Sequence, residues 1–247
     1  MKAKSILAIM VMLATIGVAN AQSGVPDVKE EHLKGTVKSI ITTVRTPQGR
    51  IVTQPIRMDF NTDGFLTRRT FYDTVGRSVI VVDYVYNNHN QLVSDTRRYG
   101  SIVAETRYVY DMVNMTATAE TYVDGTLDQK TVYVYDEDHV LHEMVTYDNE
   151  DRQLSSTEYS YNELGNKTHA IFTDGESIYK GTEKYRYDTD GFLAERCSYF
   201  LNTLRQAFLY TYYYDAKGNW VQGYVYHVTP SEGYLYQVIN RQIEYYE

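Results

Sequence analysis

The hydrophobic and polar positions of the chain repeat at an interval of about 25 residues. Each unit has an aromatic residue, one variable residue and a second aromatic residue, followed by Asp or Asn. The second aromatic lies at positions 60, 86, 110, 135, 161, 187 and 214, and only the first copy has Met (Met58) in the leading position. Alternate side chains of a strand point to one face, so both rings of a unit should share a face of a sheet.

A turn is expected directly after each aromatic pair. Asp or Asn is favoured at the first position of a type I turn, because its side chain accepts hydrogen bonds from backbone N–H groups in the turn. Three residues later the chain has types that tolerate a positive φ, which a type I turn with a bulge requires. These residues are Gly64, Asn90, Asn114, His139, Gly165, Gly191 and Gly218. With looser second turns such as Asp124-Gly125, each unit is predicted to be a two-strand antiparallel hairpin.

The units predict an all-β fold, an antiparallel β-meander or solenoid of about seven two-strand repeats over residues 58–247. Residues 22–57 are expected to contribute lead-in capping strands at 35–40 and 51–52, and residues 243–246 a closing strand. The total of about 14 to 16 strands exceeds the roughly 10 that an open sheet sustains, so the sheet should be curled or coiled, fold over, or close on itself. Valines at the variable position (Val85, Val109 and Val134) predict that its central part is covered on both faces.

The first 21 residues have the pattern of a secretory signal peptide. Lys2 and Lys4 precede an apolar run over residues 6–18, and Ala19-Asn20-Ala21 offers a small-x-small cleavage site. Gln22, not Cys, would begin the mature chain, so we expect no lipid anchor and no membrane insertion after cleavage. The protein is expected to be exported, either periplasmic or extracellular.

Composition narrows the function classes further. The chain of 247 residues has a formal net charge of -8, which argues against a nucleic-acid partner. Cys197 is the only cysteine, so an intrachain disulfide and a multi-cysteine metal site are excluded. There are 26 Tyr but only 7 Phe and 1 Trp, which makes tyrosine the most distinctive content.

The Tyr-x-Tyr-Asp-x-x-Gly phrase, clearest at residues 185–191 and 212–218, resembles the YD repeat of the Rhs and teneurin proteins. The resemblance runs over residues 58–220. It implies a curved antiparallel sheet used as a scaffold or binding surface. The chain is also similar to small exported bacterial repeat proteins of unassigned role.

No motif for nucleophilic, zinc or phosphate chemistry is present, and we expect no cofactor, no metal and no catalytic residue. His139 and His142 are three residues apart and should point to opposite faces of a strand. Asp188-Thr189-Asp190-Gly191 is similar to the opening of a calcium loop, but Tyr199 stands where the bidentate Glu is needed. Carboxylate pairs are conceivable among acidic residues such as Glu143, Glu158 and Glu183.

Tyr and Trp serve both packing and recognition, because each has an apolar ring and a polar tip. The candidate ligand-binding residues are Trp220, Tyr213, Tyr187, Tyr161 and Tyr135. We expect a non-catalytic exported binding or scaffold module that presents a curved Tyr-rich sheet to a protein or glycan at the cell envelope. The alternatives are an enzyme acting on an extracellular polysaccharide and a structural component of an envelope assembly that self-associates through edge strands.

Overall fold

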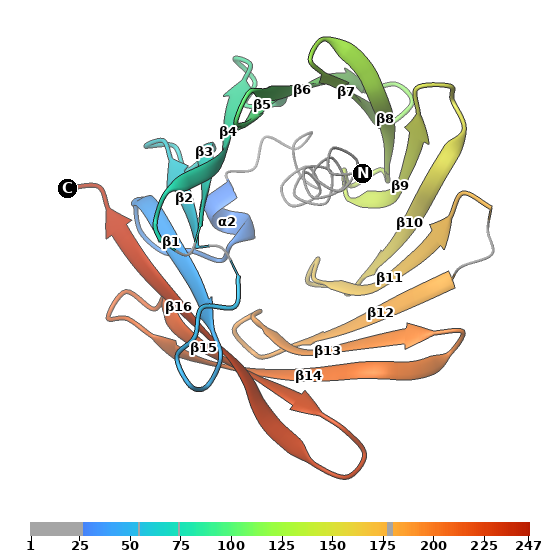
Figure 1. Ribbon diagram of the computed structural model, residues 1–247. Coiled ribbons are helices and arrows are strands. Elements are labelled where there is room, and N and C mark those ends of the chain that lie inside the picture. Colours follow the sequence, from blue (N-terminus) through green and yellow to red (C-terminus); the bar gives the residue numbers. More distant parts are fainter. Residues whose placement is uncertain (1–26, 54, 74, 177–179) are drawn as a thin grey trace.

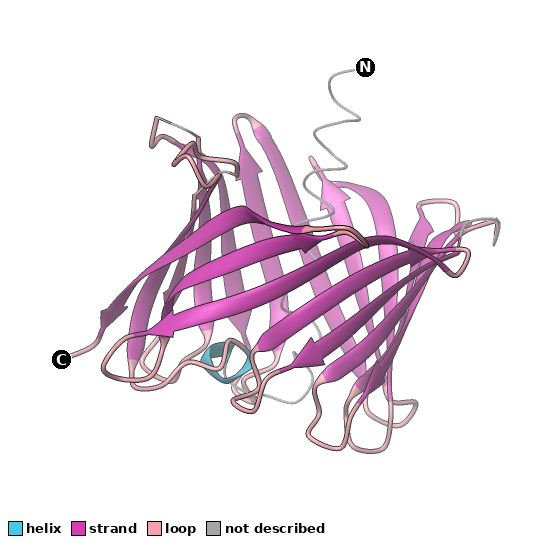
Figure 2. Cartoon of the chain, turned by 90° about the horizontal axis from the view of Figure 1, so that it is seen from below, coloured by secondary structure: helices cyan, strands magenta, loops and turns pink. Residues whose placement is uncertain are grey.

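The computed structural model describes residues 27–53, 55–73, 75–176 and 180–247, so the predicted signal peptide lies outside the described residues. Sixteen antiparallel strands form one closed barrel, viewed along its opening in Figure 1 and from the side in Figure 2. A four-residue helix, α2 (Asp27–Glu30), precedes the first strand. The strands are β1 (Val37–Arg45), β2 (Ile56–Phe60), β3 (Leu66–Tyr72), β4 (Ser78–Tyr86), β5 (Leu92–Tyr99), β6 (Ile102–Asp111), β7 (Thr116–Val123), β8 (Thr126–Tyr135), β9 (Leu141–Asp148), β10 (Gln153–Tyr161), β11 (Lys167–Asp174), β12 (Lys180–Tyr187), β13 (Leu193–Phe200), β14 (Thr203–Tyr214), β15 (Trp220–Val228) and β16 (Gly233–Tyr245).

The barrel closes because β1 pairs with β2 on one side and with β16 on the other. The β1–β16 ladder runs from Val37 opposite Tyr245 to Arg45 opposite Val238. The all-β antiparallel meander is therefore confirmed, since each strand pairs with the next along the chain, but the expected solenoid or coiled sheet is wrong. Closure pairs the backbone groups that the first and last strands of an open sheet leave unsatisfied. No described strand offers a free edge for the self-association considered above.

The two ends of the chain behave differently from the predicted caps. The first lead-in segment became β1, a full member of the barrel, and the predicted closing strand is part of β16. Of the second lead-in segment, Ile51 forms an isolated bridge to Arg45, and the next strand begins only at Ile56. The reason is that Pro55 and the turn at residues 46–50 interrupt regular pairing between the two.

The turns after the aromatic pairs follow the predicted chemistry. In the first, the Asn61 side chain accepts hydrogen bonds from the backbone N–H groups of Asp63 and Phe65, and Gly64 has φ 87°. The predicted positive φ is confirmed at every expected position except Asn114. There the positive φ falls on Met115, because Asp111 pairs directly with Thr116 across a four-residue loop without a bulge.

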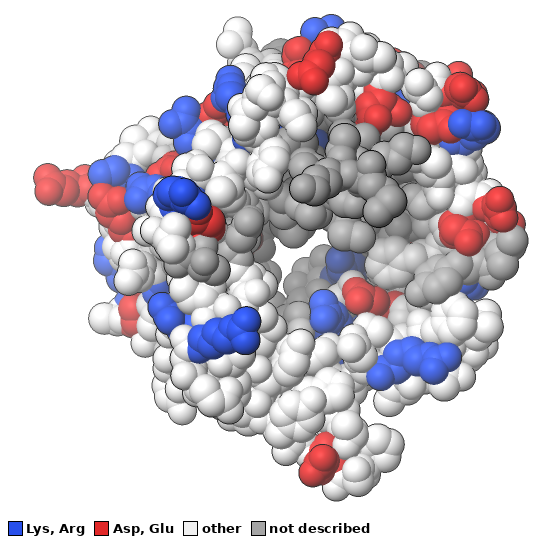
Figure 3. All heavy atoms as spheres, viewed as in Figure 1, with Lys and Arg blue, Asp and Glu red and all other residues white. Residues whose placement is uncertain are grey.

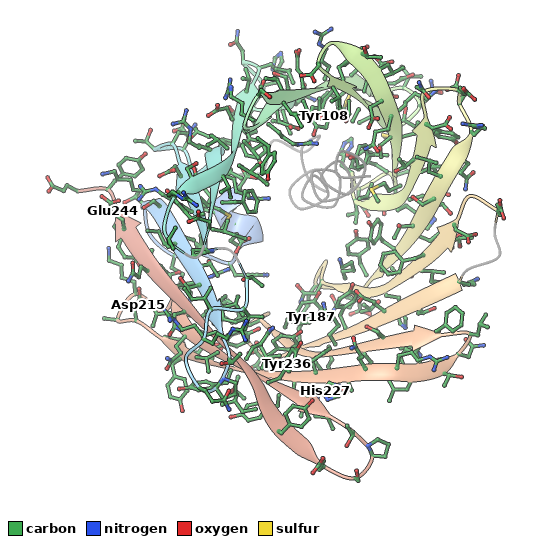
Figure 4. The ribbon with its side chains drawn as sticks, in the orientation of Figure 1. Tyr108, Tyr187, Asp215, His227, Tyr236 and Glu244 are labelled. Atoms are coloured by element: carbon green, nitrogen blue, oxygen red, sulfur yellow. The ribbon has the colours of Figure 1, made fainter. Side chains whose placement is uncertain are left out.

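The two faces of the barrel wall differ sharply. The apolar side chains that pack together point inward, as Figure 4 shows for Tyr108 and Tyr187, whereas Glu244 points outward. The variable position of each aromatic pair points outward: Val85 is 52% exposed and Val109 is 69% exposed. The expectation that the central sheet is covered on both faces is therefore wrong, because a barrel wall has only one interior side.

Ion pairs cover the outer face. Asp83 on β4 binds Arg68 on β3 and Arg98 on β5, so that one carboxylate links three strands. Lys38 and Glu244 make a similar cross-strand pair at 2.7 Å between β1 and β16. Acidic and basic side chains seen from the end of the barrel are spread around its circumference (Figure 3).

Candidate ligand site in the barrel lumen

A cavity of about 410 Å³ lies inside the barrel. Strands β8 to β16 and the segment before β1 line it, and large aromatic side chains are prominent in its wall. Its ring-bearing side chains are Tyr133, Tyr159, Tyr161, Tyr187, Phe192, Tyr212 and Trp220. The volume lies within the range of sites for small molecules, which are mostly apolar with a few convergent polar groups.

The repeat builds the barrel wall through tyrosine hydroxyls as well as rings. Tyr110 donates a hydrogen bond of 2.8 Å to the carbonyl oxygen of Leu92, and Tyr212 donates one of 2.8 Å to that of Leu193. Tyr86 makes the equivalent bond to Leu66 at 3.0 Å. In each case a tyrosine of an aromatic pair is joined to the start of the preceding return strand: the second of the pair for Tyr86 and Tyr110, and the first for Tyr212. These bonds explain why the position is Tyr and not Phe.

Two tyrosines of the cavity wall depart from this arrangement. Tyr161 and Tyr187 are half-buried, and within the described part of the chain their hydroxyls make no hydrogen bond. Burial raises the pKa of both phenols, so both remain neutral donors and acceptors at physiological pH. These two hydroxyls are available to a ligand in the cavity.

The segment before β1 crosses one mouth of the barrel (Figure 2). At one side, the Asp27 carboxylate accepts hydrogen bonds from the Leu66 backbone N–H at 2.8 Å and the Tyr86 hydroxyl at 3.1 Å. At the other side, the backbone of Lys34 makes two hydrogen bonds with the Asn219 side chain. The mouth is thereby narrowed, and Glu31 and His32 are placed in the cavity wall.

Two basic side chains reach the cavity. The Arg241 side chain is only 10% exposed, its guanidinium lies 3.6 Å from the centroid of the Trp220 ring, and its Nη2 is 2.6 Å from the Glu31 carboxylate. The Lys167 ammonium lies 4.8 Å from the ring centroid of Tyr185 and 5.4 Å from that of Tyr159. Burial lowers the pKa of both groups.

The predicted binding residues do not all share this site. Trp220, Tyr187 and Tyr161 line the cavity together. Tyr135 is 4% exposed and packs in the adjoining cluster of buried side chains. Tyr213 lies on the outer face, 61% exposed, with its ring edge-on to Tyr224 at 5.6 Å. Strand alternation separates it from its neighbours, because it is the middle residue of three consecutive tyrosines.

Sequence reasoning missed Lys167, Arg241, Glu31 and His32. Lys167 had a usable signal, since it stands at the start of a return strand where most other units have Leu. Arg241 had none, because its environment arises from the segment that crosses the mouth and from the last strand of the closed barrel.

The remaining candidates for chemistry are dispersed. Glu143 and Glu158 are cross-strand neighbours, whereas Glu183 points inward and accepts hydrogen bonds from Tyr185 and Ser198. His139 holds its predicted turn position with φ 62°. No three His, Cys, Asp or Glu side chains of the described residues gather as a metal site would require. Across the same residues, none of the helices has the length and apolarity to span a bilayer.

Comparison with known proteins identifies the fold alone. No protein-family model and no curated protein sequence matches the chain. The fold is similar to the crystal structure of a porin-like protein from Bacteroides uniformis ATCC 8492, with a TM-score of 0.57 and 11% identity over 85% of this chain and 99% of that chain. A porin-like protein from Bacteroides vulgatus ATCC 8482 matches with a TM-score of 0.38 and 11% identity over 82% of this chain and 97% of that chain.

These findings correct the resemblance to YD-repeat proteins. The chain forms a closed barrel whose fold is similar to that of a porin-like protein, and its Tyr-x-Tyr-Asp repeats are not the units of a spiralling sheet. The repeated phrase specifies a hairpin with inward-facing rings, and here that hairpin is one unit of a closed barrel.

Proposed function

We propose that the protein is an exported, non-catalytic binding protein that holds a glycan segment in its tyrosine-lined lumen. The observation that carries the proposal is the pair of half-buried tyrosines, Tyr161 and Tyr187, whose hydroxyls make no hydrogen bond among the described residues. A sugar ring offers an apolar face for stacking on aromatic rings and hydroxyls for hydrogen bonds. Tyrosine supplies both partners on one side chain.

The polarity of the outer wall supports a site that works in water. Transmembrane barrels carry an outward apolar band, and a basic residue on the lipid face costs about 2–4 kcal/mol at mid-membrane. Here the outer wall carries Arg68, Asp83 and Arg98 as one ion-paired group and Glu105 with Arg107 as another. The packed apolar clusters face the lumen, and on the outer wall exposed valines such as Val85 and Val109 stand among these charged pairs. This pattern favours ligand binding inside the barrel over the porin-like alternative of a membrane pore.

Affinity electrophoresis of the mature chain, residues 22–247, in gels containing a panel of polysaccharides tests the proposal. We expect at least one glycan to retard the protein, and the double variant Tyr161→Ala/Tyr187→Ala to lose most of that retardation. Tyr213→Ala is the matched control, because it removes an exposed tyrosine from the outer face of the same barrel. Retardation by none of the glycans, or equal loss in the control, would contradict the proposal. Shortening of the glycan would favour the alternative of a polysaccharide-degrading enzyme.

A further inference from the structure

The cavity wall carries more basic than acidic side chains, although the whole molecule is acidic. The protein has a formal net charge of -8, yet Lys167 and Arg241 face the lumen with one carboxylate, Glu31, in the same wall. Removing a cation from water costs free energy unless an anion or hydrogen-bond acceptors replace the water. Two cations with one paired carboxylate leave a positive cavity inside an acidic protein, and this arrangement requires an explanation.

The Arg241 guanidinium has N–H donors that no acceptor of the described residues engages. A guanidinium presents five N–H groups, and Glu31 engages only the Nη2 end at 2.6 Å. The Nε and Nη1 atoms are buried and have no hydrogen-bond partner among the described residues. Buried polar groups without partners are uncommon in folded proteins. A guanidinium that is 10% exposed and only partly paired lacks acceptors that a bound anion can provide.

Lys167 lacks an ion pair altogether within the described chain. Its ammonium rests against the rings of Tyr159 and Tyr185, and no carboxylate of the described residues lies within salt-bridge distance. The acidic side chain that most favours its charged form, Glu183, is already hydrogen-bonded by Tyr185 and Ser198. The lysine therefore places an unpaired positive charge beside the aromatic wall of the cavity.

We infer that the lumen selects an acidic saccharide, whose carboxylate binds the Lys167 ammonium and competes with Glu31 for Arg241. The inference rests on the proposed function and adds the ligand's charge to it. The sugar rings contact the wall at Tyr161 and Tyr187, and the carboxylate satisfies the two basic groups. Glu31 occupies the guanidinium when no ligand is bound, so its removal should strengthen binding.

Titration calorimetry of the mature protein with polygalacturonate oligosaccharides, and with the same oligosaccharides after carboxyl reduction, tests this inference. Loss of a hydrogen bond to a charged group weakens binding by about tenfold or more, so Lys167→Met should raise the Kd for the acidic sugar by that factor. Its affinity for the reduced, neutral sugar should not change. Glu31→Gln should lower the Kd for the acidic sugar, because it removes the competing carboxylate.

Lys184→Met is the matched control. Lys184 is one strand away, faces outward, and places its ammonium 5.2 Å from the ring centroid of Tyr199. The variant removes the same charge and the same type of ring contact without touching the lumen, so binding should be unchanged. Circular dichroism of each variant verifies that the barrel remains folded.

The outcomes separate the inference from the proposed function. Equal affinity for the acidic and the reduced sugar, with dependence on Tyr161 and Tyr187, would overturn the inference and leave glycan binding in place. Tighter binding of dextran sulfate than of polygalacturonate would overturn the assignment of a carboxylate and indicate a sulfated sugar. Absence of binding to every glycan would overturn both.

Discussion

Asn219 is the side chain whose loss should most clearly detach the segment that crosses the barrel mouth. It follows Gly218 in the turn between β14 and β15 and is 1% exposed. Its Oδ1 accepts a hydrogen bond from the Lys34 backbone N–H at 2.7 Å, and its Nδ2 donates to the Lys34 carbonyl oxygen at 2.8 Å and to the Tyr245 hydroxyl at 2.7 Å. One amide thus joins the turn to the segment before β1 and to the last strand.

The magnitude follows from this inventory. Asn219→Ala removes three hydrogen bonds worth about 1 kcal/mol each, so the free energy of unfolding should fall by about 3 kcal/mol. The backbone bond from the Asn219 N–H to the Asp215 carboxylate survives, so the turn itself should persist. With a urea dependence of about 3 kcal/mol per molar, the unfolding midpoint should fall by about 1 M.

Urea unfolding followed by fluorescence measures this shift, because Trp220 is the only tryptophan and is the next residue in the chain. Amide hydrogen exchange at Lys34 provides a local readout and should accelerate in the variant. Asn88→Ala is the control, since Asn88 is an exposed residue of the equivalent turn after β4. A midpoint within about 0.3 M of the control, with protected exchange at Lys34, would refute the anchoring role assigned to Asn219.

Two further predictions concern the tyrosine hydroxyls and the helix that precedes β1. Tyr212→Phe should lower the free energy of unfolding by about 1 kcal/mol, because it removes the 2.8 Å hydrogen bond to the Leu193 carbonyl oxygen. Tyr187→Phe should leave the free energy of unfolding almost unchanged. Equal urea midpoints for the two variants would contradict this distinction. Burial raises the pKa of the Asp27 carboxyl above its ordinary 3.8. The native protein therefore binds the carboxyl proton more tightly than the unfolded chain does, and the free energy of unfolding falls as pH rises through the raised pKa. Thermal unfolding measured from about pH 3.8 upward should show this loss of stability in the unsubstituted protein and a smaller loss in Asp27→Asn. Parallel pH profiles of the two proteins would contradict the role given to Asp27.

The hairpins could be predicted from sequence because their determinants are local. The Asn61 and Asp188 side chains cap turns within four residues of themselves, and Gly191 has the positive φ that the bulge requires. The miss at Asn114 has a local cause as well. Asn114 bonds back to Asp111 through its side chain, and Asp111 itself ends β6 and pairs with Thr116, so the positive φ falls on Met115.

Closure and the binding site depend on contacts between distant parts of the chain. Nothing in the local pattern states that Val37 pairs with Tyr245. The same limit applies to Arg241, whose partner Glu31 comes from the opposite end of the chain. Lys167 differs, because it is the one charged residue at a repeat position that is Leu in most other units. The departure of Lys167 from the repeat was thus visible in the sequence, but only the closed barrel shows that this residue lines the cavity.

Tyrosine in this repeat performs two tasks, and its hydroxyls divide the barrel accordingly. Around β3 to β6, the hydroxyls of Tyr86 and Tyr110 bond to the preceding return strand, so these side chains hold the wall together. Around β10 to β12, the hydroxyls of Tyr161 and Tyr187 make no such bond among the described residues, and Lys167 interrupts the run of leucines between them. Replacing a structural bond with a free hydroxyl sacrifices about 1 kcal/mol at each site. Binding a ligand in the lumen is a function that accounts for this loss, and it accounts for its restriction to one side of the barrel.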